Sequence, residues 1–412
     1  MPDSNTSIGG RVKELRRRHA LSQEALADAA KVSVAVVRKI EQGGTARMET
    51  YHALARVLGV RTVWFANPAT PAPAEAAHDE LLLADIRSAI IPPVDITGRP
   101  MRLGYDTVDA DTADLRRLRT ATDRAALAYH HDRYDDLASI IPALVRSAHH
   151  HVEHFDGDEE AEARRIRADI LSIGGRYLIQ VREHDLALAA LRASLEDAVA
   201  VGDMPLAASA VASQAWAMMR QGRLTEVETL CVTTAEQIEP KVSGASVVDL
   251  SAWGWLLIRA AAAAARNNRP DAAREYAQIA HTAGARVGAQ RQNVLSYSTF
   301  GPIDTMYSAV EVEMTAHEPA RALGLAKTRP RGVGSTDPNT ASRHRLTIAD
   351  AQIQVGDPDR ATDILMTLKA KHPEWLRQQQ AGRDVVRKLL ASRARTLSGP
   401  QRELADFMDV EG

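Results

Sequence analysis

Apolar residues recur at helical spacing over the first 65 residues of the chain. Apolar positions three or four residues apart line one face of a helix, and here they occur in short segments divided by polar turns. The pattern predicts five short helices, at Ile8 to His19, Ser22 to Ala30, Ser33 to Gln42, Arg47 to Leu58 and Arg61 to Phe65. Their apolar faces would share one core, made of Val12, Leu15, Leu21, Leu26, Val32, Val37, Ile40, Leu54 and Leu58.

The ends of these segments carry residues that start and stop helices. Ser22 and Ser33 can each accept a backbone N–H as an N-cap, and Gly43 with Gly44 would end the third helix. The turn Ala30-Lys31-Val32 joins the second and third helices. The two helices therefore form a helix-turn-helix.

A proline-rich spacer separates this region from a longer one. Residues 67–77, NPATPAPAEAA, cannot continue a helix through Pro68, Pro71 and Pro73. A short connector helix is expected at Asp79 to Ile91. We therefore expect a head at residues 1–67, a linker at 68–110 and a helical body at 111–412.

A turn of common form recurs through the body. The segments RYDDL, EHDLA, RLTEV, RPDAA, EPARA and DPDRA each place a small or aliphatic residue near the start of a helix, at Leu137, Ala187, Val227, Ala273, Ala322 and Ala361. Successive spacings of 50, 40, 46, 49 and 39 residues fit pairs of antiparallel helices, longer than the roughly 34 residues of a regular tetratricopeptide repeat. Such repeats stack into a curved solenoid with a concave surface.

Composition supports an all-α fold. Aromatic residues make up only 4% of the chain, and Ala260 to Ala265 is an unbroken run of alanine. Helices favour alanine, whereas sheets favour aromatic and β-branched residues. The single cysteine, Cys231, excludes an internal disulfide and a cysteine-based zinc site. The N-terminus lacks a signal pattern and no 18-residue stretch is free of charge, so we expect a cytoplasmic protein with no membrane segment.

Charge is unevenly distributed along the chain. Residues 1–67 hold eleven Lys and Arg against six Asp and Glu, a net charge of +5, and the remainder carries 40 against 47, a net charge of −7. A basic head on an acidic body is expected if the head meets a polyanion and the body does not. A chance fluctuation in a short window is the alternative.

The segment LSQEALADAAKVSVAVVRKIEQG resembles the DNA-binding domain of phage-repressor-type (XRE family) regulators. The shared pattern is a Leu-Ser-Gln start, an alanine-rich second helix, a Val-Ser turn, a recognition helix and a closing Ile-Glu-x-Gly, and the resemblance covers about residues 8–65. In such domains the start of the third helix enters the major groove. The resemblance implies contacts to the DNA backbone or bases by Gln23, Ser33, Val34, Ala35, Val36, Arg38, Lys39 and Arg47.

This chain departs from the family pattern at several of these positions. Three consecutive groove positions, Val34 to Val36, are apolar and could contact only thymine methyl groups, which leaves Arg38 as the candidate for a hydrogen bond to guanine. Lys31 stands where the family often has glycine, and a left-handed backbone there would cost about 1 kcal/mol. Arg47 replaces a common proline. Phosphate contacts could come from the basic residues of the first helix, Arg11, Lys13, Arg16, Arg17 and Arg18. The alternative is a head that keeps the fold, has lost DNA binding and uses its valines for a protein contact.

The body resembles the tetratricopeptide-like domains of actinobacterial XRE regulators and, more distantly, those of RRNPP peptide-responsive regulators. The stretches that carry this resemblance are REHDLALAALRASLEDAVAVGD, MMRQGRLTEVETL and FGPIDTMYSAVEVEM. Closer relatives often have Phe-Gly-Pro-x-Asn with a histidine four residues later, where this chain has Asp304 and Ser308. If the relatives hold a ligand with that asparagine and histidine, this chain has a different ligand or none.

The concave face is the expected place for an effector site, because the first helix of each pair lines it. Polar and aromatic residues on those helices are candidates, namely Gln180, Trp216, Arg220, Trp253, Arg259, Tyr297, Phe300, Asp304 and Tyr307. Each aromatic residue could instead belong to the helix-packing core, and each arginine to a solvated edge. Residues Gly288 to Pro302 form the most site-like loop. Arg220 and Arg259 could pair with a peptide carboxylate.

No enzyme chemistry stands out in the sequence. Zinc-protease spacing, the P-loop and the dinucleotide-binding glycine pattern are absent. His149, His150, His151 and His154 lack a third ligand for a metal, so a solvent-facing run at a helix end is the better interpretation. Cys231 has no adjacent base and is expected to be a buried, inert thiol. We therefore expect no catalytic residue, metal site or cofactor.

These observations favour a homodimeric, DNA-binding transcription regulator. Its head would read an inverted repeat in double-stranded DNA, and its body would bind a small molecule or peptide that changes DNA affinity. A protein-interaction scaffold with a vestigial head is the alternative, and an enzyme hidden in the body is a more remote one.

Overall fold

The chain divides into two compact units, Met1–Leu81 and Leu82–Gly412, which we call the head and the body. The computed structural model describes residues 8–19, 21–44, 46, 48–58, 83–96, 113–241, 244–392 and 397–410. The proline-rich spacer and the helical turn expected at Arg61 to Phe65 lie outside these residues. So does Arg47. Of the expected connector helix, residues 83–90 are described and are helical.

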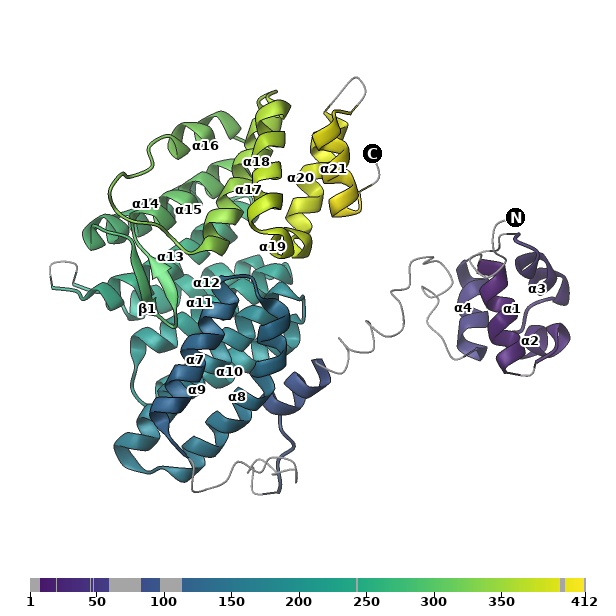
Figure 1. The fold of residues 1–412 in the computed structure, drawn as a ribbon, viewed down its shortest axis with the longest axis horizontal. Helices are drawn as coiled ribbons and strands as arrows, with labels where there is room; N and C mark the ends of the chain where they lie inside the picture. The colour runs from purple at the N-terminus through teal and green to yellow at the C-terminus, as the bar shows by residue number, and fades with distance from the viewer. Residues whose placement is uncertain are drawn as a thin grey trace. The chain divides into compact units, whose positions relative to one another are not determined.

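The described part of the head contains four helices (Figure 1), α1 (Ile8–Arg18), α2 (Gln23–Ala30), α3 (Val34–Glu41) and α4 (Met48–Val57). Each agrees with its expected range to within two residues. Ser22 Oγ accepts the Ala25 N–H at 3.0 Å and Ser33 Oγ accepts the Val36 N–H at 3.4 Å, which confirms both N-caps. The expected core is also confirmed, with Leu21 and Val32 half-buried at its edge.

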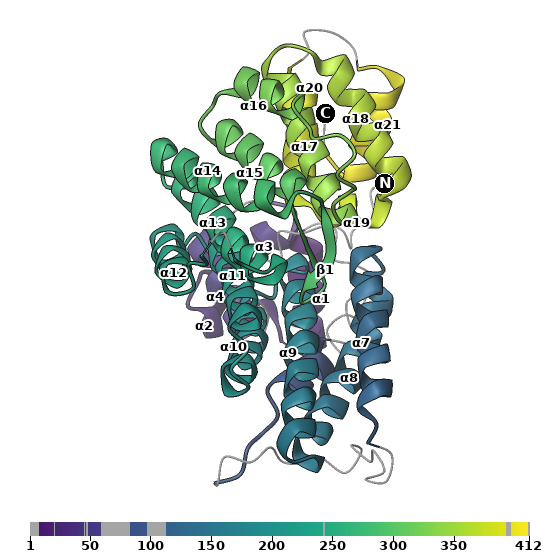
Figure 2. The same cartoon turned by 90° about the vertical axis from the view of Figure 1, so that its left-hand side faces the viewer.

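The body is a stack of antiparallel helix pairs (Figures 1 and 2). Its pairs are α7 (Leu115–His130) with α8 (Tyr134–His154), α9 (Gly157–Gln180) with α10 (His184–Ala200), α11 (Met204–Arg220) with α12 (Leu224–Gln237), α13 (Val247–Arg266) with α14 (Pro270–Val287), α15 (Pro302–Thr315) with α16 (Pro319–Ala326), α17 (Pro338–Gln354) with α18 (Pro358–Lys371), and α20 (Gln380–Ala391) with α21 (Gly399–Met408). The short helix α19 (Pro373–Gln378) precedes the last pair.

A small β-hairpin interrupts the stack between α14 and α15. Strands β1 (Arg291–Leu295) and β2 (Ser298–Phe300) pair antiparallel, with Arg291 opposite Phe300 and Leu295 opposite Ser298. Ser296 and Tyr297 form the two-residue turn with φ angles of 43° and 60°, the positive values that such a turn requires. The segment expected to be a loop, Gly288 to Pro302, is therefore largely a hairpin.

The recurring turns of the sequence are confirmed as the turns within the helix pairs. Each has one residue in the left-handed conformation, at Asp132, Arg182, Gly222, Asn268, His317 and Gly356. The next residue donates its N–H to the carbonyl five residues back, as in Glu183 to Leu178 at 2.9 Å and Asp357 to Gln352 at 2.8 Å. Five residues after each left-handed residue stands a side chain with 0% exposure, at Leu137, Ala187, Val227, Ala273, Ala322 and Ala361.

The first helices of successive pairs also touch one another. Contacts run from α7 to α9, α11, α13, α15, α17 and α20 in turn. These helices form an inner row, and their partners lie outside it. The described residues include one helix long and apolar enough to cross a membrane, α13, but 72% of that window is buried in the body as a core helix.

The inner row curves until its two ends meet. Asn339 Nδ2, at the start of α17, donates to the carbonyl of Tyr129 in α7 at 3.2 Å. Gln379 Nε2 donates to Gln180 Oε1 of α9 at 3.4 Å. In both views α19 lies next to the end of α7 (Figures 1 and 2). The concave face is thereby narrowed into a chamber that stays partly open to solvent.

Gly356→Ala tests the left-handed turn. With a φ of 86°, Gly356 adopts a conformation that costs an L-residue about 1 kcal/mol, so this variant should lower the thermal midpoint of the body. Gly324→Ala is the matched control, because Gly324 is helical with open space around its Cα and alanine should be neutral or stabilising there by up to about 1 kcal/mol. Scanning calorimetry of both variants measures the difference. A midpoint for Gly356→Ala equal to or above that of Gly324→Ala would contradict the assignment.

Candidate functional sites

A chamber of about 640 Å³ lies within the inner row of the body. Its walls come from α7, α9, α11, α13, α15, α17 and α20, together with β2 and the loops before α17 and α20. This volume is in the range of small-molecule sites. Polar side chains are frequent on the walls, and five of them are arginines, Arg176, Arg220, Arg259, Arg266 and Arg343.

Two of the arginines alternate with tryptophan rings. The Arg259 guanidinium lies 5.2 Å from the Trp255 ring centroid and 5.5 Å from that of Trp216. The Arg343 guanidinium lies 5.9 Å from the Trp216 ring. Such cation–π contacts hold a guanidinium in place without neutralising its charge. Trp255, Arg259, Trp216 and Arg343 therefore form a continuous stack along the wall, which we call the arginine stack.

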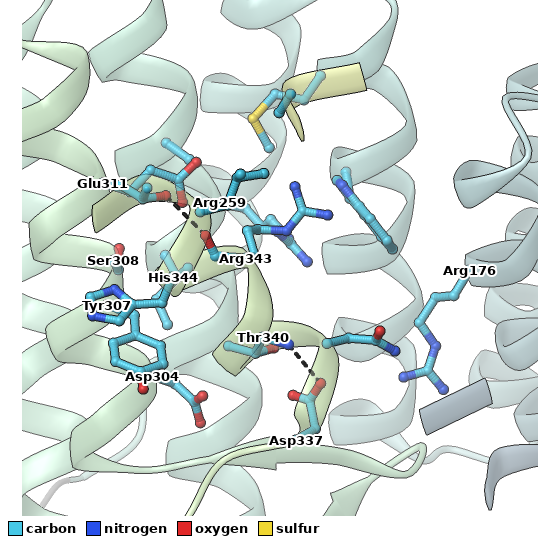
Figure 3. A pocket seen from close by; sticks show the side chains of 18 of the residues that line it. Arg176, Arg259, Asp304, Tyr307, Ser308, Glu311, Asp337, Thr340, Arg343 and His344 are labelled. Atoms are coloured by element: carbon cyan, nitrogen blue, oxygen red, sulfur yellow. Dashed lines mark hydrogen bonds between the residues drawn. The ribbon is translucent and has the colours of Figure 1, made fainter. Parts of the chain in front are cut away.

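The acidic groups on the chamber wall are engaged elsewhere. Glu311 accepts from Arg266 at 2.5 Å, and Asp350 pairs with Lys388 at 2.8 Å. Asp337 accepts the Thr340 N–H at 2.9 Å and so caps α17 (Figure 3). Among the described residues, Arg220, Arg259 and Arg343 lie within ion-pair distance of no carboxylate; Arg259 and Arg343 are half-buried and Arg220 is exposed.

Burial shifts the pKa values of Arg259 and Glu311. It lowers the pKa of Arg259 to about 10, which still leaves the side chain charged near neutral pH. Burial opposes ionisation of Glu311, but the nearby Arg266 outweighs it and lowers the pKa of that carboxyl to about 2. Arg259 and Glu311 are thus both ionised near neutral pH.

Asp304 is a structural group at the base of the chamber. It accepts from Thr336 Oγ1 at 2.5 Å, from Gln290 Nε2, and from Thr299 Oγ1 at 3.4 Å. These bonds tie the β-hairpin and the loop before α17 to the first turn of α15. Burial raises the pKa of Asp304 to about 7.

An aromatic pair covers the adjacent wall. The rings of Tyr307 and His344 stack 3.6 Å apart at 8° (Figure 3). Burial lowers the pKa of His344 to about 4, so the ring is neutral near pH 7. Ser308 lies buried beside this pair, at the position where the expected relatives have histidine.

In the head, a buried ion pair links α1 to α3. Arg16 of α1 binds Glu41 of α3 through two hydrogen bonds of 2.7 and 3.0 Å, and Gln23 Nε2 of α2 donates to the same carboxylate at 2.7 Å. Burial opposes the charge on Glu41, whose side chain is 3% exposed, yet the bonds from Arg16 and Gln23 prevail and lower the pKa of Glu41.

One face of α3 is exposed on the surface of the head. Ala35, Arg38 and Lys39 are exposed, whereas Val34 and Val36 are half-buried against the core. Arg38 pairs with Glu24 of α2 at 3.1 Å, and both side chains are more than half exposed. A pair in that setting contributes at most about 1 kcal/mol, so Arg38 can exchange Glu24 for another partner at little cost.

Residues 12–65 match the helix-turn-helix family. The head is an XRE-type helix-turn-helix DNA-binding domain. A search of curated proteins finds no match to the chain. Among solved structures, the crystal structure of Bacillus thuringiensis PlcR in complex with the peptide PapR7 and DNA is similar to this chain, with 13% sequence identity, a TM-score of 0.37, and coverage of 78% of this chain and 92% of that one.

The expected DNA-binding residues of the head differ in how far their side chains are engaged within the domain. Ser33 serves as the N-cap of α3, and both polar atoms of the Gln23 side chain are used, because its Oε1 accepts from Arg38 at 3.3 Å. Lys31 is left-handed at a φ of 53°, as the resemblance implied. The expected phosphate contacts of α1 need correction, since Arg16 is held by Glu41 and Arg11 is buried. Lys13 and Arg17 remain exposed on α1.

The chamber contains six of the nine expected effector residues, Gln180, Trp216, Arg220, Arg259, Asp304 and Tyr307. Trp253, Phe300 and Tyr297 do not line it. Trp253 is 7% exposed and packs in the core of the body, and the chamber-facing ring is Trp255, on a different side of α13. Phe300 is fully buried against Gly254, where a Cβ would collide with its ring. Tyr297 turns away and donates to Asp123 at 2.6 Å.

Several chamber residues were not predicted from the sequence, among them Arg176, Glu311 and Arg343. Arg176 lies 5.3 Å from the Tyr129 ring and donates to the Ser296 carbonyl at 2.6 Å. Its spacing of one helical turn from Gln180 was a signal in the sequence that could have identified it. Arg343 carries no comparable signal, because α17 reaches the chamber only through the closure of the ring.

The histidine run faces solvent only at its end, where His154 is exposed, so the expectation of a solvent-facing run is wrong for its middle residues. His150 and His151 are buried. His151 Nε2 accepts the Asp114 N–H at 3.0 Å, and its Nδ1 contacts the Ser147 carbonyl at 2.7 Å, so this ring ties α8 to the start of α7. The described residues contain no cluster of three possible metal ligands. Cys231 is buried, and burial raises the pKa of its thiol to about 12.

Glu41→Ala tests the ion pair of the head. Removing this carboxylate leaves Arg16 buried without its partner, which should destabilise the head by about 3 kcal/mol. Glu24→Ala removes an exposed carboxylate of the same surface and should cost less than about 1 kcal/mol. Amide hydrogen exchange in the full chain measures the opening free energy of the head separately from that of the body. Equal losses in the two variants would show that the buried pair does not stabilise the domain.

Proposed function

We propose that this chain is a cytoplasmic transcription regulator whose head binds a DNA operator and whose body binds an effector that changes DNA affinity. The observation that carries the proposal is the family match of residues 12–65, together with the exposure of Ala35, Arg38 and Lys39 on α3. In domains of this type the start of that helix enters the major groove. The chamber of the body supports the second part, because a space of about 640 Å³ with arginines and aromatic side chains on its walls has the size of a small-molecule site.

Arg38 is the residue that we assign to base recognition. It is exposed, and its present partners, Glu24 and Gln23, lie on α2. Exchange of Glu24 for guanine O6 and N7 would replace a weak surface pair with a bidentate contact. Lys39 lies one residue further along α3 and is assigned to phosphate. Val34 and Val36 pack partly on the core, so Ala35 is the exposed apolar residue that could meet a thymine methyl group.

Control of DNA affinity would follow from a dimer with two arrangements of its heads. A homodimer on an inverted repeat places two recognition helices about 34–36 Å apart. An effector that favours one arrangement shifts DNA affinity by its preference for that arrangement. The tetratricopeptide-like body would then provide both the effector site and the dimer contact.

Arg38→Ala and Lys39→Ala distinguish the two roles. Arg38→Ala should weaken binding to the operator by about 1 to 3 kcal/mol and leave the salt dependence nearly unchanged. Lys39→Ala should weaken binding to all sequences and reduce the salt slope by about 0.9. The operator is obtained by selection from random and genomic fragments at about 150 mM salt, where nonspecific phosphate contacts are weakened.

Glu24→Gln is the control for the assignment of Arg38. It frees Arg38 without removing it and should leave operator affinity equal or tighter. If Arg38→Ala weakens binding to operator and random DNA equally, base recognition by Arg38 is wrong. If selection enriches no sequence while the chain is folded, the head is vestigial and the chain acts as an interaction scaffold. The apolar residues at the start of α3 would then form a protein contact.

A further inference from the structure

We infer that the chamber binds a small organic anion that carries at least two negative charges and a hydroxyl group, such as a phosphate ester or a hydroxylated di- or tricarboxylate. This ligand would be the effector in the proposed function. Only its effect on DNA binding rests on that proposal. The ligand chemistry itself follows from the charges, contacts and dimensions of the chamber.

The first argument is the excess of positive charge. Arg220, Arg259 and Arg343 meet no carboxylate among the described residues. The only hydrogen bond within the described structure for the Arg259 side chain goes to the Ala212 carbonyl, at 3.2 Å. The single carboxylate near the arginine stack, Glu311, is already bound by Arg266. Half-buried guanidinium groups without counter-charges are costly, and a bound anion would remove that cost.

The second argument is preorganisation of the arginines. Arg259 lies between the Trp216 and Trp255 rings, and Arg343 lies on Trp216. Stacking fixes the plane of a guanidinium and leaves its N–H groups available at the edge. A fixed planar fork matches the two oxygens of a carboxylate or phosphate. The tryptophans therefore hold the arginines in position for an oxyanion.

The third argument is the placement of charge on two walls. Arg259 and Arg343 lie together on one side of the chamber, and Arg176 lies on the opposite side (Figure 3). Arg176 donates to the Ser296 and Ser172 carbonyls and forms no direct ion pair within the described structure, although Asp169 and Asp337 act on its charge from a longer distance. A ligand that satisfies both walls needs two separate anionic groups. A monoanion would satisfy one wall alone.

An unpartnered polar atom points to the remaining group of the ligand. Asn339 is 8% exposed and its Nδ2 donates to the Tyr129 carbonyl, yet its Oδ1 has no hydrogen-bond partner. A buried acceptor without a donor costs free energy, so the site favours a ligand that donates there. A hydroxyl group between the two anionic ends supplies that donor.

The closure of the ring determines the size class. The bonds from Asn339 to Tyr129 and from Gln379 to Gln180 close the inner row across the chamber. A volume of about 640 Å³ suits a metabolite-sized molecule better than an extended peptide laid along an open concave face. We therefore assign the site to a compact anion.

The test measures thermal stabilisation of the full chain by defined anions. The probes are citrate, fructose 1,6-bisphosphate and inorganic pyrophosphate, each compared with sodium chloride at equal ionic strength and with glucose as the uncharged control. We expect citrate or fructose 1,6-bisphosphate to raise the thermal midpoint of the body well beyond sodium chloride and glucose, and pyrophosphate to raise it less. The first two probes distinguish a carboxylate ligand from a phosphate ligand.

Arg343→Met removes one charge of the arginine stack and keeps an unbranched, largely apolar stem at that position. It should weaken the binding of the active probe by roughly 10- to 100-fold, as measured by calorimetric titration. It should leave the midpoint of the ligand-free chain unchanged or higher, because the lost charge had no counter-charge. A purely structural arginine would instead lower that midpoint. Arg343→Lys, which keeps the charge without the planar fork, should bind with intermediate affinity and serves if Arg343→Met does not fold.

Arg360→Met is the matched control, because Arg360 is exposed on α18 away from the chamber. It should bind the active probe as the unaltered chain does. The inference is overturned if no probe exceeds sodium chloride, or if Arg343→Met and Arg360→Met respond alike.

Operator binding with and without the active probe separates the two proposals. If the probe binds through Arg343 but operator affinity is unchanged, the anion site is supported and effector control is wrong. If the chain binds no operator while the anion site is intact, the regulator proposal fails alone. If the probe still changes DNA affinity in Arg343→Met, the probe competes with DNA at the head. That result would show that binding in the chamber does not cause the change.

Discussion

The left-handed turn within the first six helix pairs is the constraint on which the body depends. One residue with positive φ, followed by an N–H bonded five residues back, reverses the chain and positions the next helix. It also brings the residue five positions later into the tightest part of the pair. Four of those six residues are alanine, and a larger side chain there would push the helices apart. Only Gly222 and Gly356 meet the turn without strain, so the other turns rely on packing to hold a side chain at positive φ.

The chamber follows from the regular stacking of these pairs. Because each first helix touches the next, the inner row curves steadily, and its two ends meet after one circuit. The walls then carry arginines whose charges are held by tryptophan rings rather than neutralised by acids. An interior of this kind sacrifices stability, which proteins commonly do at sites of function.

The sequence allowed prediction of those features that depend on residues close together in the chain. The helices of the head and the six turns of the body are local, since caps, glycines and the buried alanine all lie within a few residues of one another.

The chamber depends on distant contacts and was only partly predicted. The face of α13 could not be chosen from its sequence, because a helix apolar on nearly every side has no distinct inner face, and Trp253 was selected in place of Trp255. Arg343 was missed for a similar reason, since only ring closure brings α17 to the arginine stack. His151 shows that a residue of a polar run can still be buried when the start of a neighbouring helix supplies a partner.

Closure of the ring has a consequence for how such a protein can evolve. Open solenoids gain or lose repeats by duplication or deletion, because each repeat contacts only its neighbours. Here Tyr129 of α7 and Asn339 of α17 must meet across the chamber, and one additional helix pair between them would displace that contact by a whole repeat. The number of repeats is therefore locked, and lineages of this protein can diversify by exchanging side chains on the chamber wall but not by lengthening the stack.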